Sequence, residues 1–330
     1  MTEIEIPDPT PPGSEPPPSA STDEEPESPY KNMLVPLVVV PAMIAMVLLL
    51  IWGFFSGLAG SEKTPRENLE QLLHGGFNER QQASFSLVRQ VLEQKDAIES
   101  GAQADWDIDE SFLPALHSAR EAVGELKGPE DVPTPFVLSS LLAQLGEPEG
   151  VHQLVEMTRL DDVVDPGGQF RLYAIWTLGA IGNKLSEPMR VEAAETLIGL
   201  LEHADEGLVL GATAGLQNLP SPGTAPALEG MLASRSLAQR GSAALSLAAL
   251  AVPAGRSVLE EMLNLEAYAA ERGDSPNKWP PRRVSESRSK ALEALNRLDL
   301  APSRANLESF AEDDPDANIR ALARELLAEI

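Results

Sequence analysis

The chain has no cysteine, and only 5% of its 330 residues are aromatic. Without cysteine it forms no disulfides, carries no thiolate nucleophile and offers no cysteine ligands to a metal ion. Basic residues are also scarce, because 25 lysines and arginines stand against 51 aspartates and glutamates, for a formal net charge of −26. A chain this acidic is repelled by phosphate backbones, so nucleic acid is not expected among its partners.

Catalytic motifs are missing as well. The sequence contains no G-x-S-x-G, no phosphate-binding loop and no G-x-G-x-x-G, and its four histidines form no H-x-x-x-H pair. An acidic turn with Asp161, Asp162 and Asp165 could hold Ca²⁺. It lacks the ligand spacing of a calcium loop, which favours a solvated turn between helices. We therefore expect a protein that is not an enzyme and that has no cofactor or metal.

Residues 1–32 form a separate compositional block. They contain nine prolines and eight acidic residues against the single Lys31. Almost nothing in this block can be buried to offset the entropy of ordering it, so we expect a disordered tail. Its proline-rich parts favour polyproline II, either as a plain solvated tail or as a docking motif for an SH3-like partner.

Residues 33–57 are predicted to form a single transmembrane helix. No charged residue occurs from Asn32 through Ser61. At ~1.5 Å per residue, the apolar run is roughly 35 Å long, which is enough to cross the hydrocarbon core of a bilayer. A cleaved signal peptide is disfavoured because the run is too long and the region before it is acidic rather than basic.

A short linker over residues 58–63 would hold the following domain close to the bilayer. Lys31 flanks the apolar run on one side, whereas Lys63 and Arg66 flank it on the other. Counting only these basic residues favours slightly a cytoplasmic location for the C-terminal domain. A difference of one charge leaves the side of the membrane open.

Residues 64–330 carry apolar side chains at helical spacing, in segments of about 10–17 residues separated by turns rich in glycine, proline and aspartate. No segment shows the sustained alternation of a strand, so the expected fold class is all-α. The sequence favours shorter helices over residues 188–203, 224–233 and 255–272, and an inserted helix over residues 110–126.

A pattern Arg-x-x-Ala-x-x-x-Leu recurs in the longer helices. Its positions share one helix face, where the alanine allows a neighbouring helix to approach and the leucine fills the seam. From residue 171 its copies begin at 209, 240, 288 and 320, in steps of 38, 31, 48 and 32 residues. These steps bracket the roughly 40-residue period of two-helix repeats. The copies are Arg171 with Ala174, Arg240 with Ala243, Arg288 with Ala291, Arg320 with Ala323, a start of the same phase at Arg80, and one copy in which Val209 replaces the arginine.

On these residues the chain resembles the HEAT-repeat family of armadillo-like α-solenoids. The resemblance covers residues 64–330, is best from 148 onward and is degenerate at 96–147. Membership would imply an α-solenoid whose second helices line a concave, protein-binding face. The fixed place of the arginines in the repeat favours a structural salt bridge or a carbonyl cap over a phosphate site.

Residues 272–283 form the longest interruption between helices in the well-repeated half, and they are locally basic. Two interpretations are open. The segment could be a projecting recognition loop in which an exposed Trp279 acts with Lys278, Arg282 and Arg283. Alternatively, it is a plain insertion with Trp279 packed against the helices.

The leading functional hypothesis is a membrane-tethered helical-repeat scaffold, without catalytic activity, that binds a membrane-proximal protein whose local concentration the anchor raises. The alternative is an accessory subunit that assembles or regulates a membrane enzyme or transporter. A catalytic repeat protein of the lyase type is a third, minor alternative.

Overall fold

The computed structural model describes residues 63–103, 106, 112–272 and 279–329. These residues belong to one compact unit, Lys63–Ile330. The tail predicted at 1–32, the transmembrane helix predicted at 33–57 and most of the linker predicted at 58–63 lie outside the described residues. Within the described residues, no helix combines the length and the apolar character needed to cross a bilayer.

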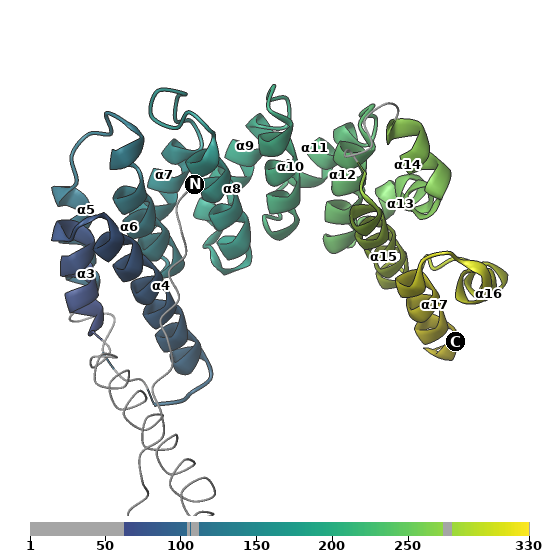
Figure 1. Ribbon diagram of the computed structural model, residues 1–330, viewed down its shortest axis with the longest axis horizontal. Helices are drawn as coiled ribbons and strands as arrows, with labels where there is room; N and C mark the ends of the chain where they lie inside the picture. The colour runs from purple at the N-terminus through teal and green to yellow at the C-terminus, as the bar shows by residue number, and fades with distance from the viewer. Residues whose placement is uncertain (1–62, 104–105, 107–111, 273–278, 330) are drawn as a thin grey trace, which may run out of the picture. The chain divides into compact units, whose positions relative to one another are not determined.

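The described residues form 15 α-helices, α3 to α17, and no strand (Figure 1). The all-α prediction is therefore confirmed for this part of the chain. Most of the helices pack in pairs. The first helices are α3 (Pro65–His74), α5 (Leu113–Ala122), α7 (Pro148–Met157), α9 (Glu187–Gly199), α11 (Thr224–Met231), α13 (Arg256–Leu263) and α16 (Arg304–Asp313). The second helices are α4 (Phe77–Glu99), α6 (Pro133–Gln144), α8 (Gln169–Ile181), α10 (Glu206–Gly215), α12 (Leu237–Ala249), α15 (Pro281–Arg297) and α17 (Ala317–Glu329).

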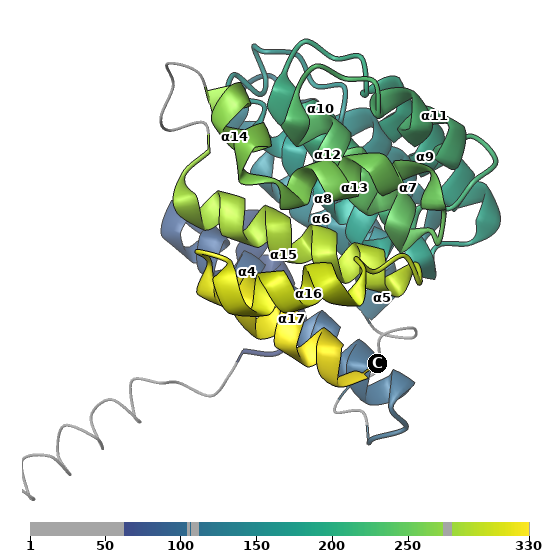
Figure 2. The ribbon, with the colours of Figure 1, turned by 90° about the vertical axis from the view of Figure 1, so that its right-hand side faces the viewer.

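The pairs stack in two rows. Each second helix from α4 to α17 contacts the second helix of the next pair, and α7, α9 and α11 likewise contact one another in sequence. Figure 2 shows the two rows end on, with α7, α9 and α11 beside α8, α10 and α12. Because neighbouring pairs cover each other's apolar faces, the core runs along the stack as a seam of three successive clusters rather than around a single centre.

The alanines of the recurring pattern lie in this seam. Ala174, Ala243, Ala291 and Ala323 are all fully buried, and Ala212 is buried at the same place in the copy that lacks the arginine. The apolar phase, rather than the arginine, is therefore what every copy shares.

The arginines of the pattern fasten the turn in front of their own helix. Arg171, Arg240 and Arg320 each donate from the guanidinium to the carbonyl oxygen six residues earlier, at 3.1, 3.3 and 2.5 Å. Arg171 and Arg240 also pair with carboxylates. These are the salt bridges and carbonyl hydrogen bonds expected for a structural role.

Arg288 departs from this geometry because α15 already begins at Pro281, so the residue six positions earlier, Arg282, lies within the same helix. Its Nε donates instead to the carbonyl oxygen of Leu263, at the end of α13, at 2.9 Å. Its two terminal nitrogens bind both carboxylate oxygens of Asp314, at 2.9 and 2.5 Å. Arg288 is 2% exposed. One buried ion pair therefore joins α15 to the turn in front of α17.

Several sequence predictions need correction. The single helix expected over 255–272 is two helices, α13 and α14 (Leu265–Arg272), because Asn264 adopts an extended backbone and its side chain accepts the backbone N–H of Glu266. The helix expected over 110–126 is the shorter α5, and it packs as the first helix of a pair with α6 rather than as an insertion. Finally, α4 has 23 residues, more than the expected range.

The closest approach between second helices is at two glycines. A Cβ added to Gly179 on α8 would lie 2.6 Å from the Cα of Gly215 on α10, and backbone there has no room to give. We predict that Gly179→Ala lowers the free energy of unfolding by about 1–3 kcal/mol through overpacking.

Gly230→Ala on α11 is the matched control, because nothing lies within 4 Å of its added Cβ. It should be neutral or raise stability by about 0.5–1 kcal/mol. Urea unfolding of the full chain in detergent, followed by circular dichroism, measures both. Equal effects of the two substitutions would contradict the tight α8–α10 contact.

Candidate protein-binding groove

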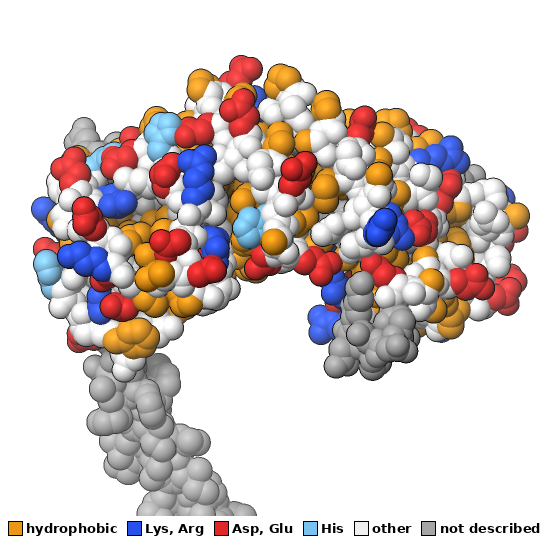
Figure 3. Space-filling model, turned by 90° about the horizontal axis from the view of Figure 1, so that it is seen from above, with side chains coloured by type: hydrophobic (Ala, Val, Ile, Leu, Met, Phe, Trp, Pro, Cys, Tyr) orange, Lys and Arg blue, Asp and Glu red, His pale blue; other side chains and the backbone are white. Residues whose placement is uncertain are grey.

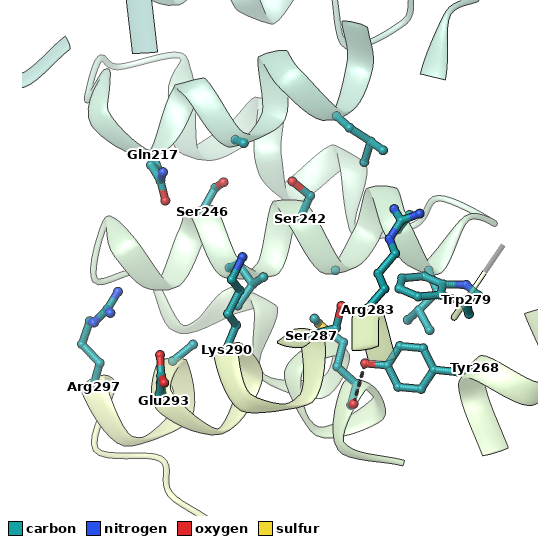
Figure 4. A pocket seen from close by; sticks show the side chains of 18 residues that line it. Gln217, Ser242, Ser246, Tyr268, Trp279, Arg283, Ser287, Lys290, Glu293 and Arg297 are labelled. Carbon is teal, nitrogen blue, oxygen red and sulfur yellow. Dashed lines mark hydrogen bonds between the residues drawn. The ribbon is translucent and has the colours of Figure 1, made fainter. Parts of the chain in front are cut away.

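The second helices share one side of the row of pairs, and this side is hollowed. Seen from above in Figure 3, the space-filling outline of the described residues curves inward between the two ends of the row. A groove of about 500 Å³ lies on this side, between α10, α12 and α15, with α13 and α14 contributing to its wall (Figure 4). We refer to it as the α12–α15 groove.

One wall of the α12–α15 groove carries a basic row. Arg283, Lys290 and Arg297 are exposed and line the groove from α15, at intervals of seven residues. Seven residues are two helical turns, so the three cations share one face of the helix. Figure 4 shows their side chains directed toward α12. Within the described part of the chain, neither Lys290 nor Arg297 forms an ion pair.

Glu293 is the one acidic residue among those lining the groove, and it stands between Lys290 and Arg297. The groove therefore has a formal charge of 3 − 1 = +2, in a chain whose net charge is −26. A local positive potential on an acidic protein is a selective feature, because it attracts anionic groups to this place.

The opposite wall carries both polar and apolar side chains. Gln217 and Ser242 face the groove, together with the apolar side chains of Leu210, Ala214 and Leu245. Amides and hydroxyls can bond a polypeptide backbone, whereas leucine and alanine accept apolar side chains. The groove is thus lined for a peptide rather than for a purely ionic ligand.

Trp279, which the two sequence interpretations placed either in an exposed recognition loop or packed against the helices, is only 3% exposed. Its ring packs edge-on against Tyr268 of α14, with centroids 4.9 Å apart. Its Nε1 donates to the carboxylate of Glu271 at 2.8 Å, and the other oxygen of Glu271 accepts the backbone N–H of Leu237, the first residue of α12, at 2.8 Å. Trp279 therefore connects the insertion to α12. Its packed position is the one that the second sequence interpretation predicted.

The same cluster shapes the end of the groove. The guanidinium of Arg283 lies 4.6 Å from the centroid of the Trp279 ring, in a cation–π contact that fixes its position at the groove mouth. Burial raises the pKa of Tyr268 to about 12, so the phenol stays protonated and donates to the carbonyl oxygen of Met262 at 2.7 Å. The buried aromatic pair thus supports the first cation of the basic row.

Of the candidate loop residues, Trp279 and Arg283 are in contact, whereas Arg282 takes no part in their cluster. Arg282 and Arg283 lie in the first turn of α15, because Pro281 starts the helix there. Arg282 does not line the groove; its side chain is 91% exposed and pairs with Glu286 at 2.8 Å. Lys278 lies outside the described residues. The sequence analysis did not identify Lys290 and Arg297 as candidates, although they follow Arg283 at successive intervals of seven residues.

The acidic turn considered for Ca²⁺ uses its carboxylates internally. Asp161 accepts the backbone N–H groups of Val163 and Val164, and Asp165 accepts the backbone N–H of Arg171. Asp162 pairs with the Arg171 guanidinium at 2.7 Å. Across the described ranges, no group of three or more potential ligands is arranged to hold a metal ion.

The chain matches no family model, and a search of curated proteins gives no match. What the geometry defines directly is an all-helical protein of stacked helix pairs with one basic groove on its hollow side. Its function is therefore argued from the groove and from the sequence.

Proposed function

We propose that the chain is a membrane-tethered scaffold of HEAT-like, armadillo-like α-solenoid type, which binds a protein partner in the α12–α15 groove and has no catalytic activity. The observation that carries the proposal is the basic row of Arg283, Lys290 and Arg297 on the hollow side of an otherwise acidic chain. Stacked two-helix repeats generally use such extended hollow surfaces for binding.

The membrane tether follows from the sequence. A helix over 33–57 would anchor the chain, and a linker of six residues over 58–63 spans at most about 20 Å when fully extended. The groove would then act on a partner at or near the bilayer, at a raised effective concentration. The basic flanks favour the cytoplasmic side for the scaffold.

Affinity purification of the full chain from solubilised membranes, with quantitative mass spectrometry, tests the proposal. We expect a stoichiometric protein partner with the wild-type chain, and its loss with Lys290→Glu combined with Arg297→Glu. Both positions are exposed, so the fold should be kept, which circular dichroism checks. Arg282→Glu, on the same helix but outside the groove, is the control and should retain the partner.

The identity of the partner separates the two binding roles. An enzyme or transporter whose activity falls when the chain is removed would favour the accessory subunit over a pure scaffold. A preparation without any stoichiometric partner that nonetheless turns over a substrate would overturn both roles and favour the catalytic alternative.

A further inference from the structure

We propose that the partner presents an extended acidic segment, with carboxylates at about every third residue, which lies along the basic row of the α12–α15 groove. This inference rests on the proposed scaffold function and names the chemistry of the partner. It is carried by the spacing of three cations, by the lining of the groove and by the position of one glutamate.

The spacing of the cations matches an extended chain. Arg283, Lys290 and Arg297 are separated by seven residues each, which along a helix is about 10.5 Å at 1.5 Å per residue. A polyproline II segment rises about 3.1 Å per residue and has three residues per turn, so residues i, i+3 and i+6 share one face and lie about 9 Å apart. Carboxylates at positions i, i+3 and i+6 of an extended segment would therefore meet the three cations in turn.

The lining of the groove favours an extended segment over a helix. Gln217 and Ser242 face the groove and can bond backbone N–H and C=O groups. These groups are free in an extended segment but already paired inside a helix. Leu210 and Leu245 offer contacts to its apolar side chains.

The charges define the sign of the ligand. Lys290 and Arg297 form no ion pair with another described residue, so their charges are available to a ligand. Glu293 opposes an acidic ligand between them, which makes it a built-in weakening group. Removing its charge should strengthen the binding of an acidic segment and of no other kind.

The acidic tail at residues 1–32 of the same chain is the competing occupant, because it is proline-rich and negatively charged. The predicted transmembrane helix places it on the other side of the bilayer from the groove, since the helix lies between the two parts. We therefore assign the groove to a segment of another protein.

The test uses the full chain reconstituted in lipid nanodiscs, which keep the two sides of the bilayer apart, and a fluorescent nine-residue peptide, Glu-Ser-Ala repeated three times. A peptide of the same composition with its three glutamates adjacent is the control ligand. Fluorescence anisotropy should give a dissociation constant about three- to tenfold lower for the spaced peptide, as expected for ion pairs at exposed sites. Its binding should weaken as salt rises from 50 to 300 mM, concentrations chosen to shorten the screening length.

Four variants make the test specific. For the spaced peptide, Lys290→Gln should weaken binding by about threefold and Lys290→Glu by about tenfold, whereas Glu293→Gln should strengthen it by about threefold. Arg282→Gln carries the same charge change outside the groove and should leave binding unchanged. General misfolding would weaken binding, so a gain in peptide affinity with Glu293→Gln cannot result from it.

Three results would overturn the inference. They are equal binding of the spaced and the clustered peptide, unchanged binding in Lys290→Glu, or a large gain in peptide affinity when residues 1–32 are removed, which would give the groove to the tail. If the wild-type chain still recovers a stoichiometric partner from membranes in these cases, the scaffold function stands and only the acidic segment fails. If it recovers none, the scaffold function itself fails.

Discussion

Replacing Arg288 with methionine should lower the free energy of unfolding by about 3–5 kcal/mol, the usual loss when one partner of a buried ion pair is removed. Arg288 and Asp314 are only 2% and 8% exposed and bind each other through two hydrogen bonds. The substitution leaves the Asp314 carboxylate buried without its partner, and it also removes the hydrogen bond to the Leu263 carbonyl. Urea unfolding of the full chain, followed by circular dichroism, measures the loss.

Two further variants isolate the cause. Arg282→Met removes a charge from the same helix at an exposed position and should change stability by less than about 1 kcal/mol. The double variant Arg288→Met with Asp314→Leu should recover much of the loss, because no buried charge is then left alone. If the double variant is as unstable as the sum of the two single ones, the ion pair is not the cause.

The same pair predicts the acid sensitivity of the fold. Burial raises the pKa of Asp314, but hydrogen bonds from Arg288 and from the backbone N–H of Asp316 outweigh this effect, so its pKa lies below the usual value. The unfolded chain would hold this pKa near about 3.9. The stabilisation is therefore complete above about pH 4 and is lost as the pH falls through the folded-state pKa. The stability difference between wild type and Asp314→Asn should shrink below pH 4.

Trp279→Ala should also cost about 3–5 kcal/mol, the range for deleting a large buried aromatic side chain. It removes the contact with Tyr268 and the hydrogen bond to Glu271. Because Glu271 also accepts the first backbone N–H of α12, the insertion and the start of α15 should loosen together. Thermal unfolding of the full chain followed by circular dichroism measures the loss.

Trp176→Ala is the matched control, because Trp176 is 51% exposed on α8. It should change stability by no more than about 1 kcal/mol. Equal losses at the two tryptophans would contradict the buried role of Trp279. The consequence for binding studies is direct: partner loss in Trp279→Ala would reflect a displaced Arg283, not a contact made by the tryptophan.

The sequence was sufficient to predict the all-helical fold class and the buried positions at which the helix pairs pack against one another. The recurring alanine and leucine positions depend only on local periodicity, which survives even where Val209 replaces the arginine. The burial of Trp279 could not be predicted in this way. It depends on Tyr268, which belongs to a separate helix that exists because the Asn264 side chain starts it.

Only part of the groove could be predicted from the sequence. The spacing of Arg283, Lys290 and Arg297 places them on one face of a helix, and that much is visible in the sequence. Which face of α15 is turned toward α12 is decided by the packing of Val284, Ala291 and Leu295, which are buried in the core on a neighbouring face of the helix. Arg282, one residue away from Arg283, therefore faces solvent and was wrongly grouped with it as a loop residue.

The central claim is that the hollow side of the stacked pairs binds a protein partner. Photo-crosslinking in intact membranes tests it most directly, with a photoreactive amino acid placed at Ser242 in the groove or at exposed Glu260 on α13, in the row of first helices. The account predicts one dominant covalent product from Ser242, absent from Glu260 and abolished by Lys290→Glu. Equal products from both positions, or a product from Glu260 alone, would contradict it.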